Sequence, residues 1–386
     1  MAGTSKLKVL VTGGAGFIGS HTVDQLLASG HEVRILDSLR PPVHDGSGLP
    51  SYVPADHAEV VLRDVRDRAA WEQALRGVDA VFHFAAYQDY LPDFSTFFHV
   101  NTVSTGLLYE VIAANRLNIK KVIVASSQAV YGEGKYRCPA CRTDSHRDSL
   151  HYPPPRGDTQ LRTGRWDVVC PDCGDPMEPE WTDEARVNPH NSYAISKYSQ
   201  ELIALQLGRR YDIPTVCLRY SIVQGPRQSF KNAYSGVLRI FAQRILTGKQ
   251  PVCFEDGGQL RDYVSIHDVT RANLLVLDDP RADFNVFNTG GDRKVTVLEY
   301  ARLVGERAAR LIEPEIPGLY RFGDTRHIFS DVGRLKSLGW HPMVSLEQTV
   351  DEYLEWVGSQ PDLEDYSTEA DARMENLGVL RMASAR

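Results

Sequence analysis

A glycine-rich turn near the start of the chain most narrows what this sequence can fold into. The apolar run at residues 8–11 predicts a buried strand. It leads directly into residues 12–19, Thr-Gly-Gly-Ala-Gly-Phe-Ile-Gly, and apolar residues then recur at helical spacing up to Gly30. A strand, a tight glycine turn and a helix in this order predict the first unit of a doubly wound α/β sheet.

The glycines of this turn also predict a ligand. Gly13 and Gly16 allow the backbone to turn tightly and approach a pyrophosphate, and Gly19 allows the helix to pack closely on the strand. The helix N-terminus supplies N–H donors and a positive dipole end, which favour phosphate. We therefore expect a dinucleotide here, contacted by Gly13, Gly16, Phe17, Ile18 and Gly19.

An acidic residue after the second strand indicates which dinucleotide is bound. The run at residues 33–36 predicts that strand, and Asp37 follows it. A carboxylate there can bind the adenosine ribose hydroxyls and would repel a 2′-phosphate, so we expect NAD rather than NADP. Arg40 nearby keeps NADP open. A glycine turn in an unrelated α/β protein stays the alternative for this motif alone.

Further strand-like runs alternate with helical stretches along the first half of the chain. They lie at residues 59–62, 80–83 and 122–125. This alternation predicts a Rossmann-type, doubly wound parallel sheet, in which ligands bind beyond the carboxyl ends of the strands. Further cofactor contacts are expected just after those ends, at Asp64, Val65, Ala85 and Ala86, and a serine pair follows at Ser126 and Ser127.

A tyrosine and a lysine four residues apart head a predicted helix at residues 198–210. On a helix, Tyr193 and Lys197 share one face. A free phenol has a pKa near ~10, and a fixed cation lowers that value. Such a pair can move a proton to and from a substrate hydroxyl near neutral pH. Taken alone, the pattern also fits an ordinary surface pair.

The ordered set of these motifs resembles one family. The glycine turn, Asp37, Asn101, Ser127 and the Tyr193/Lys197 pair follow one another as in the extended short-chain dehydrogenase/reductases, in their NAD-dependent nucleotide-sugar epimerase/dehydratase branch. The resemblance runs from about residue 8 to about residue 356, apart from one insertion. It implies a catalytic set of Ser127, Tyr193 and Lys197, the last two also contacting NAD with Asn101. It also implies a homodimer formed by helices near 101–114 and 193–210.

The resemblance also implies a nucleotide-diphosphate sugar as the substrate. The motifs at residues 225–228, 234–237, 257–264 and 324–327 are similar to the substrate-binding pattern of the branch. Guanidinium groups suit phosphate oxygens because they present fixed pairs of N–H donors and stay charged. The substrate contacts implied by the resemblance are Gln88, Ser127, Gln128, Arg227, Arg261 and Arg326, of which Arg261 and Arg326 would hold the pyrophosphate.

Departures from the family pattern narrow the expected reaction. The dehydratase and decarboxylase branches carry an acid where this chain has Ala129, so we expect an epimerase that passes through a 4-keto sugar. Two roles stay open for Asp89 and His99. Either could act as an extra acid or base, or could be an ordinary solvated or core side chain. The alternatives are a dehydratase, decarboxylase or reductase of the branch and, in a different class, a non-catalytic NAD-sensing or docking protein.

An insertion at residues 133–181 carries two Cys-x-x-Cys pairs. They are Cys138/Cys141 and Cys170/Cys173, with 28 residues between them. Four thiolates in two such pairs predict a tetrahedral, structural zinc site, which could stabilise a segment poor in apolar residues. Free thiols or a redox pair are the alternatives. Because the insertion lies between Ser127 and Tyr193, we expect it near the active site, as a lid or a docking surface.

Composition and length frame these expectations. The 386 residues are predicted to divide into an NAD-binding domain (1–132 and 182–218), the zinc insertion (133–181), a mixed, mainly substrate-binding domain (219–360) and a tail (361–386). The tail has a possible short helix at 370–380 and no predicted chemistry. A net charge of −7 argues against nucleic-acid binding. No apolar run spans a membrane and no signal peptide is apparent, so a cytoplasmic protein is expected.

Overall fold

A seven-stranded parallel sheet forms the centre of the molecule. The computed structural model describes residues 6–384 except 42, 45, 47, 90, 142–148, 230–235 and 361–365. The strand order is β13-β9-β5-β4-β1-β2-β3, and every neighbouring pair is parallel. The strands are β1 Lys8–Thr12, β2 Glu32–Asp37, β3 Ala58–Leu62, β4 Ala80–His83, β5 Lys121–Ser127, β9 Thr215–Tyr220 and β13 Val286–Thr289. The predicted doubly wound sheet is confirmed.

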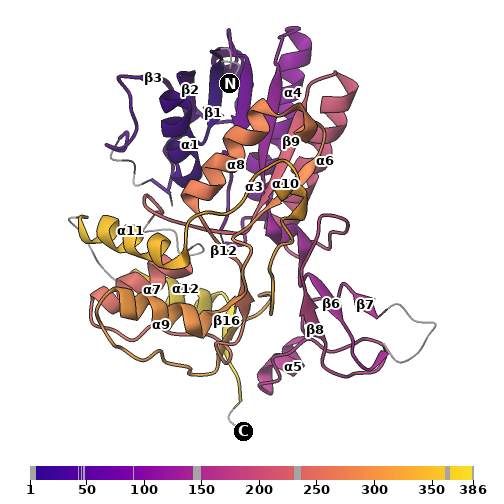
Figure 1. The fold of residues 1–386 in the computed structure, drawn as a ribbon, viewed down its shortest axis with the longest axis vertical. Helices are drawn as coiled ribbons and strands as arrows, with labels where there is room; N and C mark the ends of the chain where they lie inside the picture. The colour runs from indigo at the N-terminus through magenta and orange to yellow at the C-terminus, as the bar shows by residue number, and fades with distance from the viewer. Residues whose placement is uncertain are drawn as a thin grey trace.

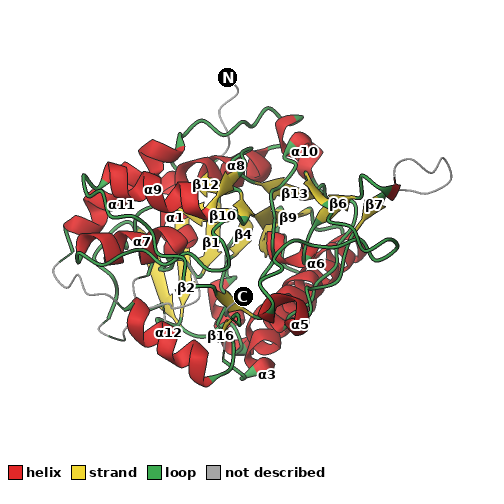
Figure 2. Ribbon diagram, turned by 90° about the horizontal axis from the view of Figure 1, so that it is seen from below, coloured by secondary structure: helices red, strands yellow, loops and turns green. Residues whose placement is uncertain are grey.

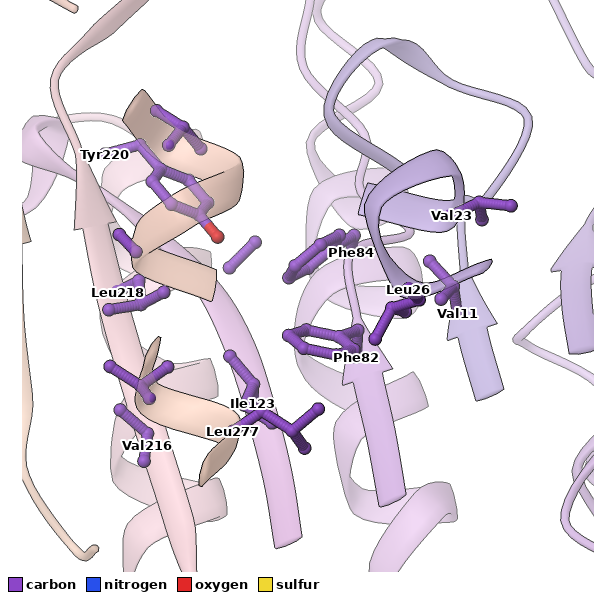
Figure 3. Packing of buried hydrophobic residues seen from close by; sticks show 14 of the residues in the cluster. Val11, Val23, Leu26, Phe82, Phe84, Ile123, Val216, Leu218, Tyr220 and Leu277 are labelled. Atoms are coloured by element: carbon purple, nitrogen blue, oxygen red, sulfur yellow. The ribbon is translucent and has the colours of Figure 1, made fainter. Parts of the chain in front are cut away.

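Helices cover both faces of this sheet, and Figure 2 shows the yellow strands lying between red helices. One face packs against α1 and α8, where Val23, Leu26 and Leu277 meet Phe82 and Ile123 of the strands (Figure 3). The other face packs against α2, α4 and α6. Burial on both faces explains why the strands are nearly continuous apolar runs. These helices are α1 Phe17–Ala28, α2 Arg68–Ala74, α4 Ser104–Ala114, α6 Ser192–Arg210 and α8 Ile266–Asp278.

A smaller lobe follows the sheet and has its own core. Helices α7, α9 and α11 enclose buried side chains that include Phe241, Tyr300 and Tyr353. Strand β13 and helix α8 also come from the region 219–360, yet they belong to the central sheet, which explains the mixed character expected of this region. The lobe contains β10 Ile222–Gln224, α7 Val237–Leu246, β11 Leu260–Arg261, β12 Tyr263–Ser265, β14 Val295–Thr296, α9 Val297–Arg307, β15 Leu319–Arg321 and α11 Leu346–Gly358.

The insertion forms a separate projecting module, at the lower right of Figure 1. Its described residues form a three-stranded antiparallel sheet in the order β7-β6-β8 and one short helix. Its buried apolar cluster is small, with Tyr136, Val168 and Met177 packed around three of the cysteines. The elements are β6 Lys135–Arg137, β7 Leu150–His151, α5 Asp158–Arg162 and β8 Glu178–Glu180.

The C-terminal tail is folded onto the smaller lobe. The predicted tail helix lies at α12, Ser367–Asn376, and β16, Leu380–Met382, then pairs antiparallel with β15. No helix in the described part of the chain is long and apolar enough to span a membrane. Within the described ranges, the remaining elements are α3 Phe94–Phe97, a π-helical segment η1 Phe98–Val103, two 3₁₀ turns, η2 Gln128–Tyr131 and η4 Pro280–Ala282, and α10 Gly333–Lys336.

Candidate active site

A cavity of about 790 Å³ runs along the carboxyl ends of the strands and into the smaller lobe. This is where a doubly wound sheet binds ligands, because the chain leaves β1 and β4 in opposite directions and opens a crevice between them. Most of the residues predicted for the cofactor line this cavity. They are Gly13, Gly16, Phe17, Ile18, Gly19, Asp37, Asp64, Val65, Ala85, Ala86 and Tyr193.

The glycine turn is shaped for close approach to a ligand. Gly13 has a φ of +67°, and a Cβ there would lie 2.8 Å from the backbone nitrogen of Ala85. A Cβ on Gly19 would lie 2.0 Å from the carbonyl oxygen of Gly13, so a larger residue would push α1 away from the turn. No side chain caps α1 at Gly16, which leaves its first N–H groups for an anion. These features fit a bound pyrophosphate.

Two carboxylates, at the carboxyl ends of β2 and β3, line the part of the cavity beside the glycine turn. Asp37 accepts hydrogen bonds from the backbone nitrogens of Ala15 (3.0 Å) and Leu39 (2.9 Å), which fix it at the end of β2. Asp64 pairs with Arg66 at 2.7 Å and with Arg40 at 3.3 Å. Burial raises the pKa of Asp64, but the hydrogen bonds from Arg66 outweigh burial and hold it below the usual value. Arg40 is thereby already paired with a carboxylate.

The catalytic set predicted from the resemblance occupies two layers. Ser127, at the end of β5, and Tyr193, in the first turn of α6, both line the cavity. Lys197 is buried behind them, where its Nζ donates to the carbonyl of Ala125 at 2.7 Å and to Oε1 of Gln200 at 3.0 Å. Burial lowers the pKa of the Lys197 ammonium to about 7, although nearby Glu201 opposes this. The lysine therefore lies behind the cavity wall.

A buried ion pair supports this second layer, and sequence reasoning missed it. Glu201, one turn after Lys197 on α6, accepts from the guanidinium of Arg219 at 2.7 and 2.8 Å. It also accepts a short hydrogen bond from Ser126 Oγ. Glu201 thus ties α6 to the ends of β5 and β9. The i, i+4 spacing from Lys197 was the available signal in the sequence.

The loop after β4 is held from behind by Asn101. The Oδ1 of this residue accepts from the backbone nitrogen of Tyr87 at 2.8 Å, and its Nδ2 donates to Ser196 Oγ at 2.9 Å. Asn101 is fully buried and is not part of the cavity lining, so its predicted cofactor contact is replaced by a role in positioning the loop. Gln88 lines the cavity, whereas Asp89 and His99 do not. Tyr90 lies outside the described residues.

Three arginines line the half of the cavity in the smaller lobe. They are Arg244, Arg261 and Arg321, and only Arg261 was predicted. Its guanidinium donates to the carbonyls of Leu260, Thr325 and Arg326 at 2.7 to 2.9 Å. No carboxylate of the described residues is within ion-pair distance of Arg261. A fixed cation without a carboxylate partner is suited to an anionic ligand.

The other two predicted arginines are engaged elsewhere. Arg227 pairs with Asp24 at 2.7 Å and lies over the ring of Tyr52, away from the cavity lining. Arg326 is buried and donates to Glu255 (3.0 Å) and Asp256 (2.7 Å). Its backbone contacts help to hold Arg261, but its own charge is already neutralised. Residues 234 and 235 of the predicted substrate motif lie outside the described residues.

The insertion contributes to the network around Arg326, because its Asp167 lies 3.1 Å from Nη2 of that arginine. Arg156, from the insertion, makes two 2.9 Å bonds to Glu255 and lies 3.4 Å from Glu133, and the backbone nitrogen of Arg326 donates to Glu133. All four side chains are almost completely buried. This network joins the module to the smaller lobe. The sequence alone did not reveal it, because its members come from four separate segments.

The insertion also reaches the cavity itself. Pro155 and Glu133 line it, and Asn188, just ahead of α6, donates to the carbonyl of Tyr152 at 3.2 Å. The expected position near the active site is therefore observed. Gln128, predicted to contact substrate, lines the same wall, and its buried Oε1 has no hydrogen-bond partner in the described structure.

The four predicted cysteine ligands meet in one cluster. Their sulfur atoms all lie within 4.8 Å of one another, with Cys138 and Cys173 at 3.5 Å and Cys141 at 3.8 Å from both Cys170 and Cys173. A zinc–sulfur bond of about 2.3 Å in a tetrahedron sets sulfur–sulfur distances near ~3.8 Å. The arrangement therefore fits a tetrahedral metal ion. His151 is adjacent, with its Nε2 3.8 Å from the sulfur of Cys170. Of the other two cysteines, Cys217 lies in the core of the sheet, as expected.

Comparison with known proteins identifies the family. Residues 9–156 and 167–290 match the model of the NAD-dependent epimerase/dehydratase family. The chain is 32% identical over 361 residues to a dTDP-L-rhamnose 4-epimerase of Burkholderia thailandensis, covering 92% of this chain and 96% of that protein. The chain belongs to the NAD-dependent epimerase/dehydratase family.

Solved structures agree with this assignment. The UDP-glucose 4-epimerase of Thermotoga maritima, determined with UDP-glucose, has a TM-score of 0.73 and 30% identity, covering 91% of this chain and 98% of that one. The UDP-glucose 4-epimerase of Thermus thermophilus, determined with NAD, has a TM-score of 0.68 and 29% identity, with the same coverage. The fold and the NAD-binding half are thus those of the family.

Proposed function

We propose that this protein is an NAD-dependent 4-epimerase of a nucleotide-diphosphate hexose. The observation that carries the proposal is the arrangement of one cavity, in which Ser127 and Tyr193 lie on the wall between a glycine turn shaped for a dinucleotide and a set of arginines suited to a diphosphate. Ala129 lines the same wall. It has no acidic group, so the site lacks the acid that elimination of water would need at this position.

The chain supplies proton transfer, and the cofactor supplies redox chemistry. Tyr193, as the phenolate, takes the proton of the sugar 4-hydroxyl and later returns it, while Ser127 donates a hydrogen bond to the same oxygen. Lys197 stands behind them and, when protonated, favours the phenolate. The glycine turn and Asp37 would hold NAD, which would supply reversible hydride transfer, so no net oxidation is expected.

The substrate class follows from the other half of the cavity. Arg261 offers a fixed positive charge to the diphosphate, and Gln128 Oε1 offers an acceptor for a sugar hydroxyl. Relatives of this chain are named for UDP and dTDP sugars. We infer a UDP- or dTDP-linked hexose as the substrate.

The test measures epimerisation by the parent enzyme and by two matched tyrosine variants. UDP-glucose, UDP-galactose and dTDP-L-rhamnose are incubated with the enzyme, and the products are identified by NMR while absorbance follows NADH. Tyr193→Phe should lose about a thousandfold in kcat, within the range for removing an acid–base group, and should still bind nucleotide. Tyr198→Phe, on the same helix and outside the cavity lining, is the control. Near-normal turnover by Tyr193→Phe would refute the base assignment, and net NADH production or consumption would favour a reductase.

We further propose that the four cysteines bind one structural zinc ion. With no open coordination position, this ion would hold the module together and would not take part in the reaction. A Cys138→Ser/Cys141→Ser variant should lose about one equivalent of zinc by mass spectrometry, and Cys253→Ser should retain it. The module is expected to act as a lid or as a docking surface. Unchanged zinc would contradict the metal site, and lost zinc with unchanged turnover and assembly would contradict both roles.

The homodimer implied by the resemblance stays a prediction. Val103 on η1 and Ile195 and Leu202 on α6 support it, because these apolar side chains are more than 40% exposed on the helices expected to pair. Sedimentation velocity would test it.

A further inference from the structure

The C-terminal tail reaches the half of the cavity that lies in the smaller lobe. Four residues of α12 line it, namely Ser367, Ala370, Asp371 and Met374. They recur every three or four residues and so form one face of the helix. The opposite face, which includes Ala372 and Glu375, is exposed. One side of α12 is therefore a wall of the cavity.

This helix holds one of the three arginines that line the smaller-lobe half of the cavity. Arg244, on α7, donates from Nη1 to Ser367 Oγ at 3.1 Å, and Asp371 Oδ2 lies 3.5 Å from the same atom. Figure 1 shows α12 beside α7 in the smaller lobe. The tail thus fixes the position of a guanidinium that faces the cavity.

The strand after the helix supports a second cavity arginine. In the pairing of β15 with β16, Arg321 lies opposite Leu380, and the backbone nitrogen of Phe322 donates to the carbonyl of Val379 at 2.9 Å. The guanidinium of Arg381 lies 4.6 Å from the ring centre of Phe322. By contrast, the side-chain contacts of Arg261 are to carbonyls outside the tail.

The tail wall combines two properties that a nucleoside diphosphate needs. Ala370 and Met374 offer apolar surface beside a cavity that Phe241 and Phe254 also line, which suits a flat base. Arg244, held by Ser367 and Asp371 of the tail, and Arg321, whose backbone pairs with the tail and whose guanidinium pairs with Asp324 at 2.7 Å, place N–H donors beside the cavity for phosphate oxygens. We propose that the segment from α12 to β16 is part of the binding site for the nucleoside diphosphate portion of the substrate. This inference rests on the proposed function for the substrate class.

The experiment measures nucleotide binding rather than turnover. Full-length protein loaded with NAD is titrated with UDP and with dTDP in a calorimeter. Ala370→Phe places a large ring in the cavity and should weaken binding of the better nucleotide by about tenfold or more. Ala372→Phe makes the same change on the exposed face and should stay within about twofold. Bound NAD, measured after release, should be equal in both.

A second pair of variants tests the same wall without adding a large side chain, in case Ala370→Phe fails to fold. Met374→Ala removes apolar surface from the wall and should weaken binding by about threefold or more. Leu377→Ala, at the residue just after the same helix and outside the cavity lining, should not. Parental affinity in both Ala370→Phe and Met374→Ala would overturn the inference.

A third variant separates this inference from the proposed function. Suppose that the parent binds UDP or dTDP, that Arg261→Gln weakens this binding and that neither tail variant does. The proposed role of the tail is then wrong, and the proposed function is retained. If the parent binds neither UDP nor dTDP, the proposed function falls and the inference falls with it.

Discussion

The two halves of the cavity are built in different ways. The half at the carboxyl ends of β1 and β2 is centred on one short stretch of chain, with a glycine turn, a helix N-terminus and Asp37 held by backbone N–H groups. The half in the smaller lobe is made from side chains on α7, β11, β15 and α12, which lie far apart in the sequence. The first half uses backbone geometry, and the second uses charged side chains fixed by partners.

This difference decides what each half tolerates. A backbone site fails when a side chain is added, because there is no room for one. A side-chain site fails when one charge is removed, because either the ligand or the partner of that charge is left unpaired. Three substitutions test the contrast.

The largest effect is expected from Gly19→Val. A Cβ at Gly19 would lie 2.0 Å from the carbonyl oxygen of Gly13, so α1 must move away from the turn. We expect NAD retained after purification to fall by about a hundredfold, as measured by release and enzymatic assay. Gly30→Val, where nothing lies near the added Cβ, is the control for a glycine replacement in the same unit, although its φ of +84° will cost some stability. Full NAD occupancy in Gly19→Val would contradict a backbone-built site.

The next-largest effects are expected from substitutions of Arg326 and Arg261, one of which should change stability and the other nucleotide binding. Arg326→Gln breaks a buried ion pair and leaves Glu255 with one fewer partner, so unfolding should cost about 3 kcal/mol less in urea. Arg261→Gln should change stability by under about 1 kcal/mol but weaken UDP or dTDP binding by about tenfold. If Arg326→Gln instead weakens binding with stability unchanged, its guanidinium reaches the diphosphate.

The smallest effect concerns Lys197 and pH. Burial lowers its pKa in the folded protein to about 7, whereas the unfolded chain keeps a lysine pKa near ~10.4. Between these values the unfolded state binds more protons, so the free energy of unfolding rises with pH, by at most about 1.4 kcal/mol per unit. The cost of burying the charge is fully present below about pH 7. Lys197→Met should lack this rise when urea unfolding is compared at about pH 7 and about pH 9, and an identical slope would contradict the lowered pKa.

The sequence predicted the sheet and the first half of the cavity because their signals are local. Apolar runs marked β1, β2, β3, β4 and β5, and the glycine turn and Asp37 stand at fixed distances along one βα unit. The four cysteines were likewise identified from two short motifs, although 28 residues separate the pairs. In each case the residues that act together are also neighbours along the chain, or carry a spacing that chemistry dictates.

The smaller lobe could not be predicted in the same way. Arg261 and Arg326 look equivalent in the sequence, yet Arg326 is neutralised by Glu255 and Asp256. Arg244 was missed because nothing in its own segment indicates Asp371, which lies 127 residues later. Asn101 was assigned to the cofactor, but the side chain turns to the backbone of Tyr87 instead. Partner choice over such separations depends on the tertiary fold.

The position of α12 has a consequence for how the enzyme matures. A chain grows from its N-terminus, and its earlier parts can fold while later parts are still being made. The glycine turn and Asp37 are complete early in synthesis. The wall at Ala370 and Met374 belongs to the last stretch of chain that contributes to the cavity lining. Under the proposed function, a nascent chain therefore completes its dinucleotide turn before the wall proposed for the nucleoside diphosphate. A variant that ends before α12 would keep the first and lack the second.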